Sequence, residues 1–542
     1  MFTRWISPEA SNNEYHFVSG GATNVHFWKI EGSALTKKES RAGKYKQKPI
    51  LCAANLKMKG DEYRLVTGTS QGDLYVFAFD RECKNAIEGA HEGAILTLAE
   101  GGRNEFIISG GMDKCIRIWN RALQAISHHK FDQSPLVSPV NAYVASLDYR
   151  VDDNNLVVLV GTYGGEIIEV MAKDSEHSNK KGESRDGINF DIMSACEVKV
   201  LMHSHYSGEL WGVAPHPLDA DIVATGGDDG TVRLWSLRMN KMIACETTQR
   251  PVRCVGWSPD GQLLAVGFHE STKGGGKVKP ASRKKNKKAP PKKKKDGRSG
   301  GGSDEATASC FIYSCTIEGT RSRLRRVGFG GSSTAWISDI KFSPSGSLLA
   351  MGSHDKRLYV YNVPEHDIES EDAWATAFEA PKYAFNKHSS AITHFDFSED
   401  ERFFQTNCQA YELLFGEVAS GKQKTSATEL RNYNAPASGD SKGFWSTWTC
   451  VLGWPVQGIW AEGADGSDIN SVDRSLANSL LATADDSGLV KLFRYPCIDD
   501  GSKYNAYPGH SSHVTNVRWS TGENLLSVGG NDKCLFIWKL TM

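Results

Sequence analysis

The chain has 542 residues, of which 39% are hydrophobic and 23% are charged, so it contains enough apolar material for a sizeable folded core. Its first residues, 1–8, lack the apolar run of a secretory signal peptide, and no stretch approaches the roughly 18 apolar residues of a membrane span. These observations argue against a secreted or membrane-spanning protein and predict a cytoplasmic one.

The net charge of −1 conceals an uneven distribution. The segment from Lys273 to Arg298 holds thirteen basic residues and one acidic residue, so it contributes +12 and the rest of the chain −13. The twelve cysteines are scattered singly and form no Cys-x-x-Cys pair. We therefore expect reduced, buried thiols and neither disulfides nor a bound metal ion.

One motif occurs three times in the chain. Residues 110–119, 226–235 and 529–538 each begin Gly-Gly-x-Asp, continue with alternating apolar residues and end in Trp. In each copy the Trp lies six residues after the Asp, and a His lies 22 to 24 residues before the Asp. The Gly and Asp are typical of a tight turn between two strands, and the alternation indicates a half-buried strand. Each copy therefore predicts a β-hairpin.

The polar members of this motif are candidate structural residues. A His, the turn Asp and the Trp indole can form a hydrogen-bonded chain across one four-stranded sheet, so that none of them is buried unpaired. A catalytic His–Asp pair is the alternative, but such a pair is expected once in a chain and this pattern recurs. The predicted structural residues are His91, Asp113, Trp119, His205, Asp229, Trp235, His510, Asp532 and Trp538.

Weaker copies fill the intervals. Some keep a Ser-Pro-x-Gly turn, as at 258–261 and 343–346, and others replace the Trp by Phe or Tyr, as at Phe77, Tyr361 and Phe493. In chain order we expect ten strand units at residues 15–30, 50–79, 91–119, 140–170, 205–237, 252–313, 337–363, 388–415, 445–495 and 510–540, the first of them incomplete. A period near 40 residues with four strands per unit resembles the WD-repeat β-propeller. Because propellers usually close with about four to eight blades, ten units favour an all-β chain of two tandem rings.

Several longer stretches carry a closer resemblance. Residues 445–460 read Trp-Ser-Thr-Trp-Thr-Cys-Val-Leu-Gly-Trp-Pro-Val-Gln-Gly-Ile-Trp, and they continue through 461–470 into the stretches 481–488 and 491–497. Together with residues 27–32, 89–93, 209–212 and 509–517, these stretches resemble the echinoderm microtubule-associated protein-like family. The resemblance is collinear from about residue 14 to the end.

The resemblance implies two atypical tandem propellers that associate with microtubules as a structural scaffold, without enzyme activity or cofactor. By analogy, the rings divide near residue 200, giving a partial N-terminal propeller at 1–199 and a C-terminal propeller at 200–542. Family members carry further blades and a hydrophobic motif ahead of the position of Tyr15, and many carry a coiled coil; the sequence lacks all of these. We therefore expect an incomplete first ring with an open sheet edge, as in a fragment, a truncated gene model or a ring completed by a second polypeptide.

The same resemblance implies partners and a location. The implied partners are tubulin and other microtubule-associated proteins, and the implied location is the cytoplasmic microtubule array or the ciliary axoneme. A different class of function is the alternative: a general WD-repeat interaction hub, such as a ubiquitin-ligase substrate receptor or a signalling scaffold, because the fold alone does not fix the function.

A basic insertion at about 269–304 interrupts one predicted blade. Its like charges repel and it offers little to bury, so it predicts a disordered loop. The loop is either a solvated spacer or a docking segment for a polyanion, for which acidic tubulin tails fit the resemblance, and a nuclear targeting signal is a further alternative. Nucleic acid is not expected, because no aromatic stacking residues are interleaved with the charges. The candidate contacts are Lys284, Lys285, Lys287, Lys288, Lys292, Lys293, Lys294 and Lys295.

The four tryptophans of residues 445–460 have two interpretations. They pack a junction between blades or rings, or they form an exposed recognition patch, since Trp is enriched at interaction hot spots. These residues are Trp445, Trp448, Trp454 and Trp460.

Catalytic signatures are absent from the sequence. Residues 416–422 begin like a phosphate-binding loop, but Gln423 stands where that loop requires Ser or Thr. Residues 326–331 are glycine-rich without a βαβ unit, which indicates an ordinary loop. The sequence therefore predicts no nucleophile, metal or cofactor site.

Overall fold

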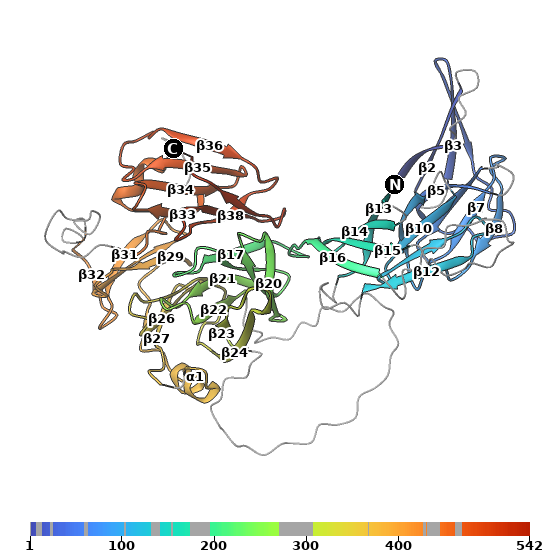
Figure 1. Ribbon diagram of the computed structural model, residues 1–542. Coiled ribbons are helices and arrows are strands. Elements are labelled where there is room, and N and C mark those ends of the chain that lie inside the picture. Colours follow the sequence, from blue (N-terminus) through green and yellow to red (C-terminus); the bar gives the residue numbers. More distant parts are fainter. Residues whose placement is uncertain are drawn as a thin grey trace, which may run out of the picture. The chain divides into compact units, whose positions relative to one another are not determined.

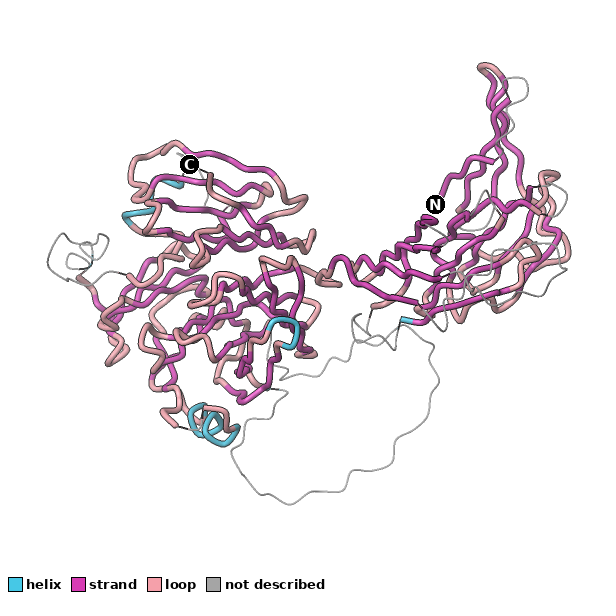
Figure 2. The backbone as a smooth tube through the Cα atoms, in the orientation of Figure 1, coloured by secondary structure: helices cyan, strands magenta, loops and turns pink. Residues whose placement is uncertain are grey.

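The computed structural model describes residues 2–6, 14–21, 25–58, 63–101, 105–131, 141–152, 155–173, 196–269, 307–366, 368–426, 430, 445–460 and 469–541. The chain forms two compact units, Met1–Tyr206 and Ser207–Met542. Antiparallel strands make up nearly all of the regular structure in both, and helix is confined to short segments (Figures 1 and 2).

The first unit contains four four-stranded sheets, in each of which neighbouring strands follow one another in the chain. The sheets are β1–β4, β5–β8, β9–β12 and β13–β16. The strands are β1 (Phe2–Ile6), β2 (Glu14–Gly20), β3 (Val25–Glu31), β4 (Ala34–Glu39), β5 (Ile50–Lys57), β6 (Tyr63–Thr69), β7 (Leu74–Phe77), β8 (Cys83–Ile87), β9 (Ile95–Gly101), β10 (Phe106–Gly111), β11 (Cys115–Trp119), β12 (Ala125–Lys130), β13 (Val144–Asp152), β14 (Asn155–Thr162), β15 (Ile167–Lys173) and β16 (Cys196–Met202).

The second unit contains five four-stranded sheets and a final sheet of three described strands. The sheets are β17–β20, β21–β24, β25–β28, β29–β32, β33–β36 and β37–β39. The strands are β17 (Leu210–Pro215), β18 (Ile222–Gly227), β19 (Thr231–Ser236), β20 (Lys241–Thr247), β21 (Val252–Trp257), β22 (Leu263–Phe268), β23 (Cys310–Thr316), β24 (Arg323–Gly330), β25 (Ile337–Phe342), β26 (Leu348–Ser353), β27 (Leu358–Asn362), β28 (Tyr383–Phe385), β29 (Ile392–Phe397), β30 (Phe403–Cys408), β31 (Leu413–Glu417), β32 (Gln423–Lys424), β33 (Ile469–Ser475), β34 (Leu480–Asp485), β35 (Leu489–Arg494), β36 (Tyr504–Pro508), β37 (Val514–Trp519), β38 (Leu525–Gly529) and β39 (Leu535–Trp538).

Three short helices have described bounds. The α-helix α1 (Glu371–Phe378) buries Trp374 and Phe378 beside β24, and two 3-10 helices, η3 (Gly319–Arg321) and η5 (Trp454–Ile459), lie in connections. None of the described helices has the length and apolar character needed to cross a bilayer.

The ten sheets match the ten strand units expected from the sequence. The first of those strand units, residues 15–30, was expected to be incomplete, and this expectation is wrong. The sheet β1–β4 has four strands. The sequence pattern missed β4 because the whole strand is exposed and therefore lacks the alternation of apolar and polar residues that marks a half-buried strand.

The second unit closes into a ring. The first strand of each sheet, as in β17, β21, β29 and β33, lies toward the middle of the ring, and the last strand of each sheet lies at the periphery (Figure 1). Six separate hydrophobic cores lie between its six sheets, one for each neighbouring pair. The closing pair is joined by hydrogen bonds across 305 residues of sequence, from Thr515 Oγ1 to the carbonyl oxygen of Leu210 at 2.6 Å and from Asn516 Nδ2 to that of Trp211 at 3.2 Å.

The first unit has a different arrangement of cores. Three hydrophobic cores join its four sheets in chain order, from β1–β4 to β13–β16. Among the described residues the four sheets thus follow one another as an arc of blades.

Candidate interaction face

The repeated His, Asp and Trp residues lie within individual sheets. His91 Nδ1 lies 2.8 Å from Asp113 Oδ1, and His91 Nε2 lies 2.7 Å from Ser109 Oγ, which also accepts the indole N–H of Trp119 at 2.8 Å. The His–Asp–Trp chain therefore runs through a serine hydroxyl that was not identified from the sequence.

The last sheet repeats this geometry. His510 Nδ1 lies 2.9 Å from Asp532 Oδ2, His510 Nε2 lies 2.7 Å from Ser527 Oγ, and the Trp538 indole donates to the same hydroxyl at 2.7 Å. The histidines are buried, and their partners belong to their own sheet. These side chains join the segment before the first strand of a blade to its second and third strands.

In the sheet β17–β20, the Trp235 indole donates to Thr225 Oγ1 at 2.7 Å, and His205 is buried. Asp229 accepts hydrogen bonds from Thr231 and Arg233. The sequence does contain a signal for the hydroxyl that accepts the indole N–H. A Ser or Thr stands ten or eleven residues before each of the three Trp residues.

Residues 445–460, which we call the aromatic segment, pack between the sheets β29–β32 and β33–β36. Trp445 and Trp448 are almost fully buried in a core that includes Phe403 and Phe493 from the two flanking sheets. Arg474 of β33 donates to the backbone oxygen of Trp445 at 2.6 Å. These two tryptophans therefore fill a junction between blades.

The other two tryptophans of the aromatic segment lie differently. Trp454 is 44% exposed, whereas Trp460 is half-buried and donates its indole N–H to the backbone oxygen of Val451 at 3.1 Å. The four residues thus do not form one exposed patch.

A charged network surrounds the centre of the second ring. A cavity of about 240 Å³ is lined there by residues of the first strands, including Asp339, Lys341, Asp473 and Arg518. Lys341 Nζ lies 2.6 Å from Asp339 Oδ2 and 3.6 Å from Asp396 Oδ1. Burial opposes the charge on Lys341, but the two carboxylates outweigh burial and raise the pKa of this lysine. The pairing of Lys341 with two carboxylates is consistent with a structural role for this lysine.

An aromatic and cationic stack lies on the face of the ring from which the inner strands β17, β21 and β25 begin. The guanidinium carbon of Arg253 lies 4.1 Å from the ring centre of Trp211 and 4.7 Å from that of Trp336. Trp336 in turn stacks between His269 and His354, with ring centres 4.2 and 4.5 Å apart. We call these five residues the aromatic–arginine stack.

Burial changes the ionisation of two members of the stack. Burial lowers the pKa of Arg253, and Asp228 Oδ1 lies 3.4 Å away. Burial, with the nearby Arg253 charge, lowers the pKa of His354, so that ring is neutral at pH 7. Trp211 Nε1 has no hydrogen-bond acceptor among the described residues. Half-buried Trp and Arg side chains of this kind are typical of interaction hot spots.

Sequence reasoning missed this stack, because its members come from three different sheets. Only Trp211 was noted, as part of the family resemblance.

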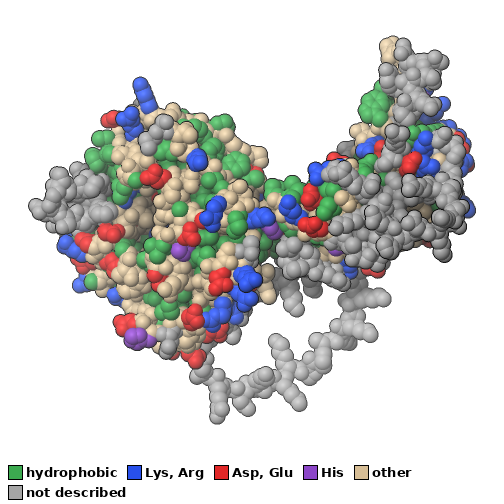
Figure 3. Space-filling model, viewed as in Figure 1, with side chains coloured by type: hydrophobic (Ala, Val, Ile, Leu, Met, Phe, Trp, Pro, Cys, Tyr) green, Lys and Arg blue, Asp and Glu red, His purple; other side chains and the backbone are tan. Residues whose placement is uncertain are grey.

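The predicted polyanion contacts, Lys284 to Lys295, lie outside the described residues. The visible surface of the second unit has acidic, basic and hydrophobic side chains interspersed (Figure 3).

Ten small antiparallel sheets, with a His–Ser–Asp–Trp chain in at least two of them, define a WD-repeat β-propeller protein. Residues 81–120 match the family model of the WD domain, G-beta repeat, and residues 210–540 match that of the echinoderm microtubule-associated protein second beta-propeller. The chain belongs to the echinoderm microtubule-associated protein-like family, whose members are structural propeller proteins rather than enzymes.

Relatives match nearly the whole chain. It is 30% identical over 526 residues to human echinoderm microtubule-associated protein-like 2, covering 96% of this chain and 66% of the relative. It is 27% identical over 536 residues to the 77 kDa echinoderm microtubule-associated protein of Strongylocentrotus purpuratus, covering 97% of this chain and 63% of the relative. It is 26% identical over 525 residues to mouse echinoderm microtubule-associated protein-like 1, covering 96% of this chain and 52% of the relative. The chain thus spans less than two thirds of the length of each of these relatives.

Proposed function

We propose that this chain binds microtubules as a structural scaffold and that the aromatic–arginine stack of the second ring is a contact surface. The observation that carries the proposal is membership of a family whose relatives are named for association with microtubules and match the chain across both units. The stack supports the choice of surface, because its Trp and Arg residues are half-buried at the mouth of a closed ring.

Cosedimentation with taxol-stabilised microtubules tests the binding. The full chain is expected in the pellet at tubulin excess, and a chain that stays in the supernatant would contradict the proposal. Affinity purification from cells is expected to recover tubulin and other microtubule-associated proteins. A preparation dominated by ubiquitin-ligase subunits would instead support the interaction-hub alternative.

A pair of substitutions tests the contact surface. Trp336→Ala removes the ring that contacts Arg253, His269 and His354, and it is expected to weaken microtubule binding at least about tenfold, as loss of a hot-spot residue does. Leu218→Ala is the matched control, because Leu218 is 72% exposed and follows the far end of β17. Equal affinities of the two variants, with unchanged thermal melting, would place the contact elsewhere.

The basic segment provides a second, electrostatic contribution to the proposed binding. Deleting residues 277–298 removes most of its +12 charge, so we expect weaker binding and a smaller loss of affinity with added salt. Unchanged affinity and salt dependence would identify the segment as a spacer.

Two finer parts of the proposal concern location and assembly. We place the chain on ciliary axonemes as well as cytoplasmic microtubules. Imaging of the tagged chain in ciliated cells tests this, and the lack of an axonemal signal would contradict it.

We also propose that a second polypeptide completes the first ring, which the arc of four sheets supports. Native mass spectrometry of the purified complex is expected to show an additional chain, and the mass of this chain alone would contradict it.

A further inference from the structure

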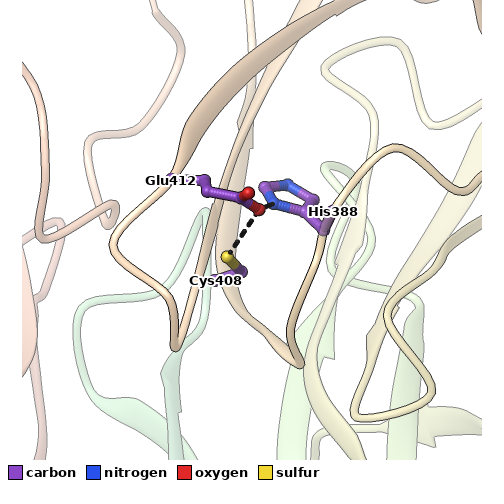
Figure 4. Close-up of side chains that lie close together, drawn as sticks. All are labelled: His388, Cys408 and Glu412. Atoms are coloured by element: carbon purple, nitrogen blue, oxygen red, sulfur yellow. Dashed lines mark hydrogen bonds and ion pairs between the residues drawn. The ribbon is translucent and has the colours of Figure 1, made fainter.

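The sheet β29–β32 contains a cluster of three different side chains at the end where β30 turns into β31. His388 precedes β29, Cys408 ends β30, and Glu412 lies in the turn before β31; their side chains point toward one another (Figure 4). Cys408 Sγ lies 3.1 Å and His388 Nδ1 lies 3.2 Å from Glu412 Oε2, and one nitrogen, sulfur or oxygen atom from each residue lies within 4.8 Å of the others.

The position of Cys408 sets this sheet apart from two related blades. Cys408 lies two residues after the hydroxyl partner of the histidine, Thr406, and the corresponding residues elsewhere are Gly111, after Ser109, and Gly529, after Ser527. A Cβ at Gly111 would lie 2.6 Å from His91 Nδ1, and a Cβ at Gly529 would lie 2.5 Å from His510 Nδ1. In those blades glycine therefore permits the direct His–Asp pair.

The acidic residue has also changed in this sheet. Glu412 lies 24 residues after His388, whereas the aspartates of the two other blades lie 22 residues after their histidines. The β30–β31 and β10–β11 turns have the same length, because Asn407 pairs with Leu413 as Gly110 pairs with Ile116. Glu412 therefore lies two residues further along its turn than Asp113 does, and its side chain is longer by one methylene, which leaves room for the sulfur. The repeat alone does not explain a thiol at this position.

The tryptophan of the repeat is missing as well. Gly416 stands at the position of the tryptophan in this sheet. It pairs with Phe404, just as Trp119 pairs with Ile107 and Trp538 pairs with Leu525 in the two related blades. Within the described part of the chain, no indole donates to the threonine hydroxyl of this sheet.

The freed hydroxyl allows a different tautomer of the histidine. Thr406 Oγ1 lies 2.6 Å from His388 Nε2 and 3.2 Å from the backbone oxygen of Leu414. When the hydroxyl donates to the backbone oxygen of Leu414, it accepts a hydrogen bond from Nε2–H, and Nδ1 then presents its lone pair to Cys408 and Glu412. A histidine that ligates through one nitrogen while the other donates to an oxygen is the usual arrangement at a metal ion.

The charges of the three side chains suit a divalent ion. His388 ligates as a neutral imidazole, and Glu412 offers a carboxylate oxygen. When the thiol of Cys408 releases its proton to solvent and a metal–sulfur bond forms, the three ligands carry two negative charges, which match a divalent cation.

We propose that His388, Cys408 and Glu412 bind a divalent transition-metal ion, for which zinc is the best match to mixed nitrogen, sulfur and oxygen ligands. Tetrahedral zinc places N and O ligand atoms about 3.4 Å apart and S and O about 3.6 Å apart. The distances from Glu412 Oε2 to His388 Nδ1 and Cys408 Sγ, 3.2 and 3.1 Å, are shorter than these values by about 0.2 and 0.5 Å. Glu412 is partly exposed, so water can take a fourth position. The ion would clip the β30–β31 turn to the segment entering β29, a role beyond the proposed microtubule binding.

Metal content of the full chain tests the proposal. After equilibration with zinc and dialysis, the wild type is expected to retain one more equivalent per chain than Cys408→Ser. With Co²⁺, only chains that keep Cys408 are expected to show a thiolate-to-cobalt charge-transfer band. Cys534→Ser is the matched control, since Cys534 lies in the His510 blade with its sulfur beside the backbone oxygen of Asp532, and it should keep both properties.

Two further variants separate binding from folding. Cys408→Gly restores the residue of the related blades, so it is expected to fold and to lose the metal. Thr406→Val removes the partner of His388 Nε2 and should weaken binding about 10–100-fold. Equal metal content in the wild type, Cys408→Ser and Cys408→Gly, or a cobalt spectrum without the thiolate band, would overturn the proposal.

Discussion

The carboxylate of Asp396 anchors the aromatic segment to strand β29. It accepts the hydroxyl of Thr447 at 2.6 Å, the backbone N–H groups of Thr449 and Cys450 at 3.0–3.1 Å, and it lies 3.6 Å from Lys341 Nζ. Asp396 is fully buried. We predict that Asp396→Asn loosens this anchor, because the amide nitrogen is a donor that would face these N–H and O–H groups.

The magnitude follows from the charge that is lost. Removing one partner of a buried ion pair costs about 3–5 kcal/mol. Burial alone would raise the pKa of Asp396, but Lys341 and then the hydrogen bonds from Thr447 and Thr449 lower it from 3.8 to about 2. This shift corresponds to a contribution on the order of 2–3 kcal/mol at neutral pH. Because the folded-state pKa is lowered, the contribution is complete above the ordinary pKa and is lost as the pH falls through about 2.

Urea unfolding and hydrogen exchange measure the effect. We expect Asp396→Asn to lower the free energy of unfolding of the second ring by about 3–5 kcal/mol and to increase exchange selectively in residues 445–460. Asp400→Asn is the control, because Asp400 is an exposed turn residue that bonds Ser398 and Arg402, and its loss should cost about 1 kcal/mol or less. Equal losses in the two variants, without local exchange in the aromatic segment, would refute the anchoring role.

Three further substitutions address other parts of the chain. Trp448→Ala should cost about 3–5 kcal/mol in thermal unfolding because the ring is buried between two sheets, and a loss no larger than that of Trp454→Ala, whose ring is 44% exposed, would contradict this. Burial raises the pKa of Asp473 from 3.8 to about 6, so the folded state disfavours the ionised form of this carboxyl. The free energy of unfolding of the wild type should therefore fall as the pH rises from about 4 to about 6, and Asp473→Asn should remove a part of this decline worth roughly 3 kcal/mol. Identical pH profiles of the wild type and the variant would contradict this. Trp119→Phe deletes the indole bond to Ser109 and should cost about 1–2 kcal/mol, with a double-mutant cycle against Ser109→Ala showing coupling; additive losses would mean that the bond contributes nothing.

The sheets were largely predictable because their signals are local. The alternation at Ile116 and Ile118 and the Ser-Pro-x-Gly turns, whose Gly261 and Gly346 have positive φ, depend only on neighbouring residues. Strand β4 escaped the prediction because it is exposed along its length, so no apolar pattern marks it. The hydroxyl of Ser109 escaped because serine is common and its role appears only when β10 pairs with β11.

The proposed metal ligands could not be found from the sequence. The absence of paired cysteines predicted no metal site, but a search for such pairs detects only ligands that lie close together in the chain. His388 and Cys408 are brought together because β29 and β30 pair and the next turn folds back on them. The proposed site is thus a property of one sheet rather than of a sequence motif.

By itself the sequence determined the repeat, the count of sheets and the family, because side-chain alternation and turn chemistry act between residues close together in the chain. Only the tertiary structure decided which distant side chains meet: Arg253 between Trp211 and Trp336, Asp396 with Thr449, and Thr515 with Leu210 across the closure of the ring. It also decided that Trp448 is buried while Trp454 is exposed. The physical reason is that the packing of one blade against the next sets these contacts, and the alternating pattern of a strand carries no information about which residue of the next blade will face it.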